Sequence, residues 1–167
     1  MKKILYIVII LVSILLLTGC EEVEEPPKNG RKEATGEVYE AKLDDDGNIV
    51  IDKMKITKEV SYYSYEYEGV IISILAVKDE NGKNHIMINT CTSCGGSPYA
   101  YFVQVNDKVQ CQNCGNLFVI SKLDEVDEDG CNPIKIENIE EKGNSYVIDH
   151  YEIEMYKDKF LNWYGPK

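Results

Sequence analysis

The sequence predicts a mostly β domain of antiparallel sheets that carries two cysteine-containing turns. From about residue 37 onward, short runs rich in Val, Ile and Tyr alternate between apolar and polar residues. Residues typical of turns separate these runs. The phrase Cys-x-x-Cys-Gly occurs twice, at residues 91–95 and 111–115, and each copy fits a tight turn between strands.

The individual strands follow from the runs and from the turns between them. Residues 78–83, centred on Asn-Gly, predict a hairpin turn. Residues 43–48 predict another turn rather than a calcium loop, because the closing glutamate of such a loop is missing. The last stretch, 152–164, fits either strand or a short C-terminal helix. The predicted strands lie within residues 37–43, 48–52, 60–68, 70–79, 85–89, 116–120, 134–140 and 145–156.

The N-terminus has the pattern of a lipoprotein signal peptide. Two lysines precede an apolar run at residues 4–17, which is shorter than the ~20 residues of a membrane span and fits a signal-peptide core. Leu-Thr-Gly-Cys at 17–20 resembles a bacterial lipobox, so we expect residues 1–19 to be removed and Cys20 to carry lipid such as palmitate. An uncleaved anchor helix is the alternative. Both alternatives place the rest of the chain on the extracytoplasmic side of the cell membrane.

The chain beyond the signal peptide has the size of one domain and is strongly acidic. Without residues 1–19, 148 residues remain, and the formal net charge falls from −11 to −13. An acidic surface argues against nucleic acid and anionic lipid headgroups as partners. Residues 20–36 are charged, contain a Pro-Pro pair and predict a flexible tether. Residues 37–167 then form the metal-binding domain.

The doubled phrase predicts a four-sulfur metal site. Two cysteines separated by two residues can bind one ion, because a tight turn brings both sulfur atoms to one side, and the glycine that follows can adopt the left-handed conformation that closes the turn. One such knuckle supplies two thiolates, and a tetrahedral centre needs four. Residues 99–109 predict the hairpin that brings the knuckles together. The spacing C-x2-C-x16-C-x2-C lies in the zinc-ribbon range and gives Cys91, Cys94, Cys111 and Cys114 as ligands.

Other uses of these cysteines compete with a metal site. The extracytoplasmic setting permits structural disulfides, but a bond within each Cys-x-x-Cys would close a very small loop and stabilise little. A thioredoxin-like redox pair would begin a helix, and Cys-Gly-Gly-Ser-Pro is a poor helix start. A further cysteine, Cys131, lies between the turn-forming pairs Asp-Gly and Asn-Pro and is an additional candidate ligand on a loop. The spacing alone does not separate zinc from iron.

Residues 91–136 combine paired knuckles, an aromatic residue after the first, a Val-x-Cys-x-x-Cys-Gly-x-x-Phe segment and then Gly-Cys-Asn-Pro. In this combination the chain resembles the bacterial FtrD-like membrane iron–sulfur proteins, over roughly residues 36–165. The resemblance implies an iron–sulfur cluster on the four knuckle cysteines, with Cys131 unassigned, and a link to ferrous iron uptake. The second knuckle also looks like half of a Rieske motif with cysteine in place of histidine, which implies a lower reduction potential.

These observations give a leading functional hypothesis and an alternative. The leading one is a surface-anchored lipoprotein whose iron–sulfur centre transfers electrons or handles metal, with an iron permease or a membrane redox protein as partner. The alternative is a zinc-stabilised binding module without a redox role. The signal region lacks twin arginines, so export in an unfolded state favours zinc, which four thiolates satisfy fully. No nucleophile motif indicates a hydrolase, which favours an electron-transfer or metal-binding component over an enzyme.

Overall fold

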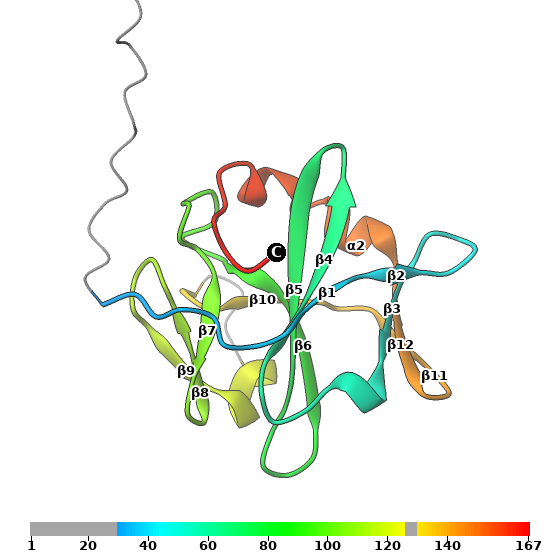
Figure 1. Cartoon of the computed structure of the whole chain (residues 1–167), viewed down its shortest axis with the longest axis horizontal. Helices are drawn as coiled ribbons and strands as arrows, with labels where there is room; N and C mark the ends of the chain where they lie inside the picture. Colours follow the sequence, from blue (N-terminus) through cyan, green and yellow to red (C-terminus); the bar gives the residue numbers. More distant parts are fainter. Residues whose placement is uncertain (1–29, 126–129) are drawn as a thin grey trace, which may run out of the picture.

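The structure of the protein, a computed structural model, describes residues 30–125 and 130–167 (Figure 1). The predicted signal peptide, the predicted lipidation site Cys20 and the first part of the predicted tether lie outside these residues. Within them, no helix is long and apolar enough to cross a membrane. The predicted fold class is confirmed, because strands in three sheets account for most of the regular structure.

A five-stranded sheet forms the centre of the fold. Its strands pair antiparallel, except that β1 runs parallel to β4. The long hairpin β4–β5 and the next strand, β6, supply most of its area. In order across the sheet, the strands are β1 (Val38–Glu40), β4 (Ser61–Tyr67), β5 (Val70–Lys78), β6 (Asn84–Cys91) and β10 (Pro133–Lys135).

A four-stranded antiparallel sheet covers one face of the central sheet, and an isoleucine-rich core fills the space between them. Ile49 and Ile51 of β3 and Ile72 and Ile74 of β5 are fully buried in this core. They stand at every second position, as expected where one strand face is buried. The strands of this sheet are, in order, β11 (Ile139–Lys142), β12 (Ser145–Ile148), β3 (Ile49–Asp52) and β2 (Lys42–Leu43), and the short 3-10 helix η1 (Lys53–Lys55) follows β3.

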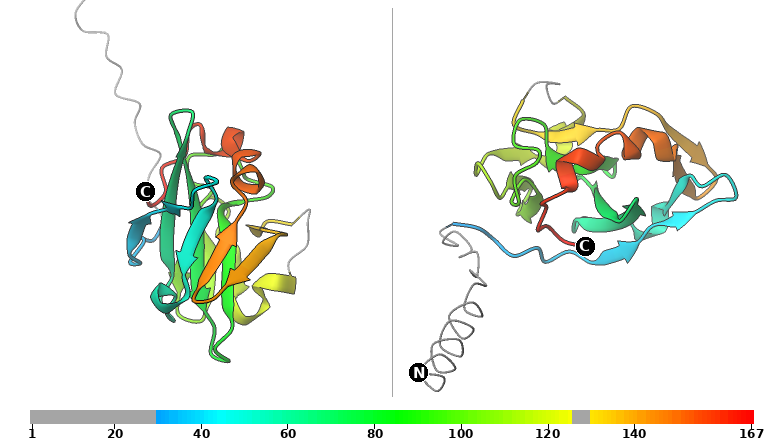
Figure 2. Two further views of the ribbon diagram at one scale, coloured as in Figure 1. Left: turned by 90° about the vertical axis from the view of Figure 1, so that its right-hand side faces the viewer. Right: turned by 90° about the horizontal axis from the view of Figure 1, so that it is seen from above.

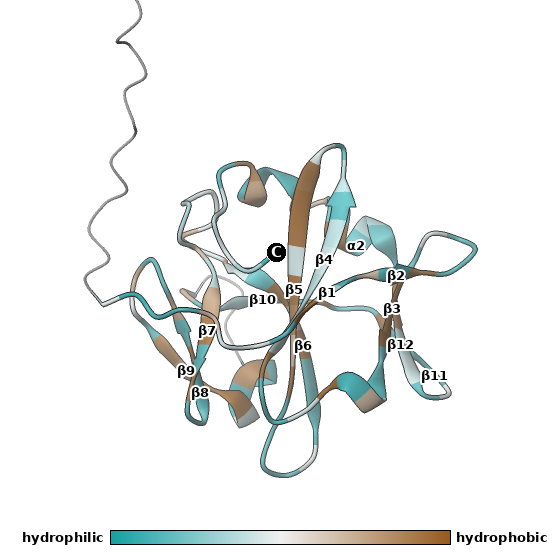
Figure 3. Cartoon of the chain, in the orientation of Figure 1, coloured by the Kyte–Doolittle hydropathy of each residue, from teal (hydrophilic) through white to brown (hydrophobic). Residues whose placement is uncertain are grey.

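A three-stranded sheet packs on the other face of the central sheet. Leu75 and Met87 of the central sheet meet Phe102 and Val109 in a second core cluster. Because β5 is covered on both faces, its residues form an almost continuous apolar run, visible as the brown strand in Figure 3. The elements on this side are β7 (Phe102–Val105), β8 (Lys108–Cys111), β9 (Leu117–Val119) and the 3-10 helix η2 (Ile120–Glu125).

The C-terminal segment is helical and lies against the β4–β5 hairpin (Figure 2). Helix α2 (His150–Glu154) begins at Asp149, whose side chain accepts a hydrogen bond from the Tyr151 N–H, and the 3-10 helix η3 (Lys157–Phe160) follows. The hydroxyl of Tyr65 donates to Glu154 at 2.7 Å. The predicted short C-terminal helix is thus confirmed, and it ties the end of the chain to the central sheet.

One buried side chain connects the central sheet to the three-stranded sheet. Asn89 of β6 is fully buried; its Oδ1 accepts a hydrogen bond from the Phe102 N–H at 2.9 Å, and its Nδ2 donates to Ser73 Oγ at 3.3 Å. The first bond holds the start of β7 beside β6. It therefore positions the hairpin that leads to the second cysteine knuckle.

Replacing Asn89 with Ala should lower the free energy of unfolding by about 1–3 kcal/mol, because the buried Phe102 N–H loses its partner. The neighbouring Thr90→Val is the matched control. Thr90 is equally buried, but within the described residues its hydroxyl has no hydrogen-bond partner. Removing this hydroxyl should therefore leave the free energy of unfolding almost unchanged. Urea denaturation followed by far-UV circular dichroism measures both. Equal effects of the two changes would contradict this role of Asn89.

Candidate metal centre

Each cysteine knuckle begins at the last residue of a buried strand. Cys91 ends β6 and Cys111 ends β8, and both side chains are fully buried. The second cysteine of each knuckle lies further out, because the chain turns toward the surface. Cys94 is half-buried and Cys114 is exposed. The doubled motif therefore presents sulfur atoms in two layers, one inside the fold and one at its rim.

The two turns close at different glycines. In the second knuckle, Gly115 has a φ of +79°, and its N–H donates to the Cys111 carbonyl at 2.9 Å, as the motif predicts. In the first knuckle, Gly96 rather than Gly95 takes the left-handed conformation, with a φ of +95°. The expectation of a left-handed glycine directly after the pair is therefore wrong for the first knuckle. A Cβ at Gly95 would lie 2.7 Å from the flexible Lys159 side chain, which would then have to shift.

All five cysteines of the described residues converge, and each carries a free thiol. The sulfur atoms of Cys91, Cys94, Cys114 and Cys131 lie within 4.8 Å of one another. Cys111 is not in that mutual group, but it packs in the same buried cluster as Cys91, with Cys94 and Cys131 against that cluster. The structure thus brings together the four knuckle cysteines and Cys131, and it places Cys131 rather than Cys111 in the tightest set of four.

Hydrogen bonds from the first knuckle hold the Cys131 loop in place. The amide and hydroxyl of Thr92 both donate to the Asn132 carbonyl, at 3.0 and 3.3 Å. The hydroxyl of Ser93 donates to the Gly130 carbonyl at 3.0 Å. Both chain neighbours of Cys131 are therefore anchored, and β10 pairs with β6 immediately afterwards. This arrangement fixes the Cys131 sulfur beside the knuckles.

Three of the clustered thiols, those of Cys91, Cys94 and Cys114, have a raised pKa. The hydrogen bond to Cys111, together with burial, raises the pKa of the Cys91 thiol well above its ordinary value. Burial is the main cause that raises the pKa of Cys94 and of Cys114. Metals bind the thiolate, so binding must displace these protons. A compact set of thiol donors suits soft or borderline metals, either zinc or the iron of an iron–sulfur cluster.

A lysine from the C-terminal segment covers the first knuckle. The Nζ of Lys159 donates to the Thr92 carbonyl at 3.2 Å, and its own carbonyl accepts from the Gly96 N–H at 3.1 Å. An ammonium group at this place favours the negative charge of several thiolates. The sequence gives no sign of this contact, because Lys159 is 65 residues from Cys94 along the chain and nothing in the local pattern marks it.

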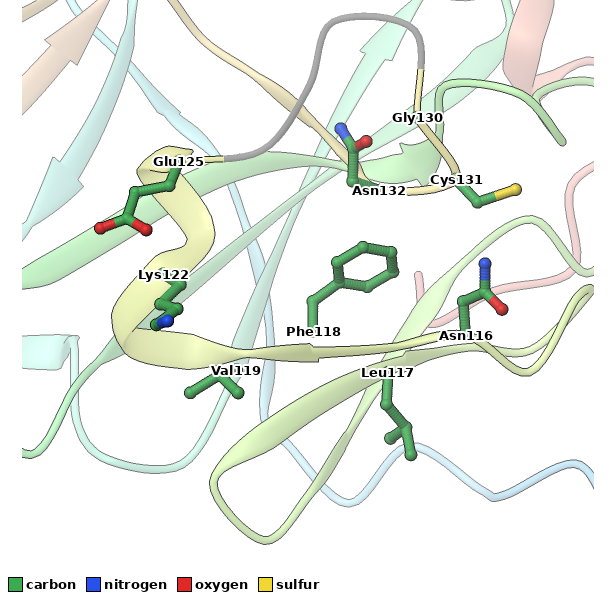
Figure 4. A pocket seen from close by; sticks show the side chains of 9 residues that line it. All are labelled: Asn116, Leu117, Phe118, Val119, Lys122, Glu125, Gly130, Cys131 and Asn132. Atoms are coloured by element: carbon green, nitrogen blue, oxygen red, sulfur yellow. The ribbon is translucent and has the colours of Figure 1, made fainter.

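A hollow of about 410 Å³ opens beside Cys131 (Figure 4). Phe118 of β9 and Asn116, just before β9, point toward the Cys131 loop, whereas Leu117 and Val119 point to the opposite side of the strand. The hollow gives the rim of the sulfur cluster access to solvent. Its lining residues are Asn116, Leu117, Phe118, Val119, Lys122, Glu125, Gly130, Cys131 and Asn132.

A family model described as "Membrane iron-sulfur containing protein FtrD-like" matches residues 55–160, which include all five clustered cysteines. This chain belongs to the FtrD-like family. No curated protein sequence matches the chain. Among solved structures, a crystal structure of the quaternary ammonium Rieske monooxygenase CntA with an inhibitor is similar at 11% identity and a TM-score of 0.40. The similarity covers 70% of this chain and 32% of that one.

Gly115→Ala in this FtrD-like protein should disturb the metal centre specifically. A non-glycine residue in the left-handed conformation costs about 1–2 kcal/mol, and here the strain would fall on the turn between Cys114 and β9. Gly69→Ala is the matched control, because Gly69 has a φ of +76° and equally open surroundings in the distant β4–β5 turn. Both variants should lose similar stability. Only Gly115→Ala should weaken zinc binding, by about tenfold or more, in a competition titration with a chelator.

Metal binding should release protons and weaken as the pH falls. Because the pKa of Cys91, Cys94 and Cys114 is raised, these thiols are protonated at neutral pH, and each proton displaced makes the apparent affinity fall by up to about tenfold per pH unit. Calorimetric zinc titrations of the reduced apo-protein, in buffers of different ionisation enthalpy, count the protons. A count of about three or more is expected, and a count near zero would contradict it.

Proposed function

We propose that this FtrD-like protein is a lipid-anchored, extracytoplasmic electron carrier with an iron–sulfur centre, working in iron uptake. The observation that carries the proposal is the convergence of free thiols, four of them within 4.8 Å of one another, in a chain of an iron–sulfur family. Four cysteine thiolates are the usual ligands of [2Fe–2S] and [4Fe–4S] clusters. The knuckle cysteines Cys91, Cys94, Cys111 and Cys114, together with Cys131, supply enough donors.

The burial of the donors suits electron transfer. Cys91 and Cys111 anchor the centre in the core, while Cys114 is exposed and Cys94 and Cys131 are half-buried. A cluster held there would have a protected inner side and an outer side close to the surface, where a partner can approach. We propose a membrane redox protein or an iron permease as that partner, reached because Cys20 carries the lipid anchor and residues 20–36 act as a tether.

The chemistry of the bound group is that of the cluster: it takes up and gives back one electron. The protein's part is to hold the thiolates, limit the access of water and set the local charge. Lys159 places a positive charge beside the first knuckle through its contact with Thr92. Because it favours the more negative, reduced state, it raises the reduction potential relative to an uncharged residue at the same position.

A zinc-stabilised binding module is the second candidate function. The observation in its favour is the completeness of the donor set, since four thiolates satisfy tetrahedral zinc and leave no open position. In that case the metal would join the central sheet, the second knuckle and the Cys131 loop without redox chemistry. The exposed side of the domain would then bind a partner.

Anaerobic purification from the native membrane separates these functions. The iron–sulfur proposal expects a brown protein with iron and sulfide in equal amounts, and a visible absorption that bleaches on reduction. Cys91→Ser should lose the colour and most of the metal, because a buried ligand is removed. Cys20→Ser is the control: it should release the protein from the membrane with its spectrum unchanged. A colourless protein that contains one zinc would overturn the electron-transfer proposal.

A further inference from the structure

The site holds more thiols than one metal centre needs. Five cysteines converge, whereas a tetrahedral ion or an all-cysteine cluster takes four. The surplus thiol either fills space or has a function in binding. The contacts among the sulfur atoms decide between these roles.

Two sets of four share three members. Cys91, Cys94 and Cys114 belong to the tightest group, and Cys131 completes it. Cys111 adjoins the shared three instead: it packs in the same buried cluster as Cys91, and it begins the turn that leads to Cys114. The Cys114 and Cys131 sulfur atoms lie within 4.8 Å of each other. Cys114 is therefore close to one candidate for the fourth position through space and to the other through the turn of its own knuckle.

The two candidates differ in depth and in backbone support. Cys111 is fully buried at the end of β8; its N–H donates to the Asn116 carbonyl, and its carbonyl accepts from the Gly115 N–H. It is part of the protein core and stays inside. Cys131 is half-buried on a loop that is hydrogen-bonded to the first knuckle, and it lies at the edge of the hollow beside Phe118. One candidate is thus an inner ligand and the other an outer ligand.

We propose that Cys111 and Cys131 are alternative fourth ligands of one metal centre, with Cys131 used for capture and release and Cys111 for retention. Metal arriving from outside first meets Cys114, Cys94 and Cys131, which face solvent, and then Cys91. The exchange is balanced: a metal–sulfur bond to Cys131 breaks as one to Cys111 forms, the Cys111 thiol gives up its proton, and the Cys131 thiolate takes one. No electrons move. The inference rests on the proposed metal site but not on the identity of its metal.

The test uses the reduced apo-protein under anaerobic conditions, with Co²⁺ as the probe, because sulfur-to-cobalt charge-transfer intensity reports the number of bound thiolates. Cys111→Ser and Cys131→Ser should each bind one equivalent with the intensity of the parent, because the other thiol takes the fourth position. The double variant should lose about a quarter of the intensity and at least about a hundredfold in affinity. Cys91→Ser, which removes a shared ligand, should resemble the double variant.

The rates separate the two roles. Cys131→Ser should take up Co²⁺ several-fold more slowly than the parent in stopped-flow mixing, since the outer ligand is missing. Cys111→Ser should load at the parental rate but lose Co²⁺ several-fold faster to a chelator, since the inner ligand is missing. A structural role for either cysteine would not produce this reciprocal pattern.

Three results would overturn the proposal. If Cys111→Ser alone behaves like the double variant, Cys131 does not replace it; the reverse result removes Cys111 from the set of ligands. A double variant with parental affinity shows that neither residue binds metal. Far-UV circular dichroism checks folding, and Cys111→Ala serves where serine is not tolerated in the core. Failure of the electron-transfer proposal is seen separately, as absence of iron and sulfide from the purified protein.

Discussion

The C-terminal end of β6 is the part of the fold on which the metal centre depends. Five consecutive residues, 89–93, hold two other segments of the chain and supply one sulfur atom. Asn89 holds the start of β7, Cys91 supplies a sulfur atom, and Thr92 and Ser93 hold both sides of the Cys131 loop. Because β6 lies within the central sheet between β5 and β10, these contacts start from a strand that is paired on both sides.

This arrangement explains how segments far apart in sequence can form one site with little freedom. Fixing a loop costs conformational entropy. Here backbone hydrogen bonds, and the metal when it is bound, offset that loss. A bound metal would join β6, the end of β8 and the start of β10, so its binding energy contributes to folding. The outer thiols need this support most, because Cys94 and Cys131 lie on turns rather than in strands.

A cluster of polar side chains around the buried His85 supports the same region from the other end of β6. The imidazole of His85 lies between two carboxylates, with Nε2 3.3 Å from Asp79 and Nδ1 3.2 Å from Asp124. Burial by itself raises the pKa of Asp79, but hydrogen bonds from Lys83, His85 and Asn81 together hold it below its ordinary value. Asp124 belongs to η2, the helix that precedes the Cys131 loop. The cluster therefore attaches this helix to the central sheet.

Local patterns in the sequence determined the strands and the knuckles. Each of the eight predicted segments overlaps a strand, because alternation of apolar residues and turn chemistry act over a few neighbouring residues, although the last segment, 145–156, is helical from His150. The repeated motif likewise indicated that Cys91, Cys94, Cys111 and Cys114 belong to one site. The tertiary structure alone decided that Cys131 joins them. The neighbours of Cys131 are held by hydrogen bonds between residues that are 37 and 40 positions apart in the sequence. The tertiary structure also decided that Lys159 lies against the first knuckle. The packing of the C-terminal segment on the central sheet is set by contacts between residues distant in sequence, which a local pattern does not reveal.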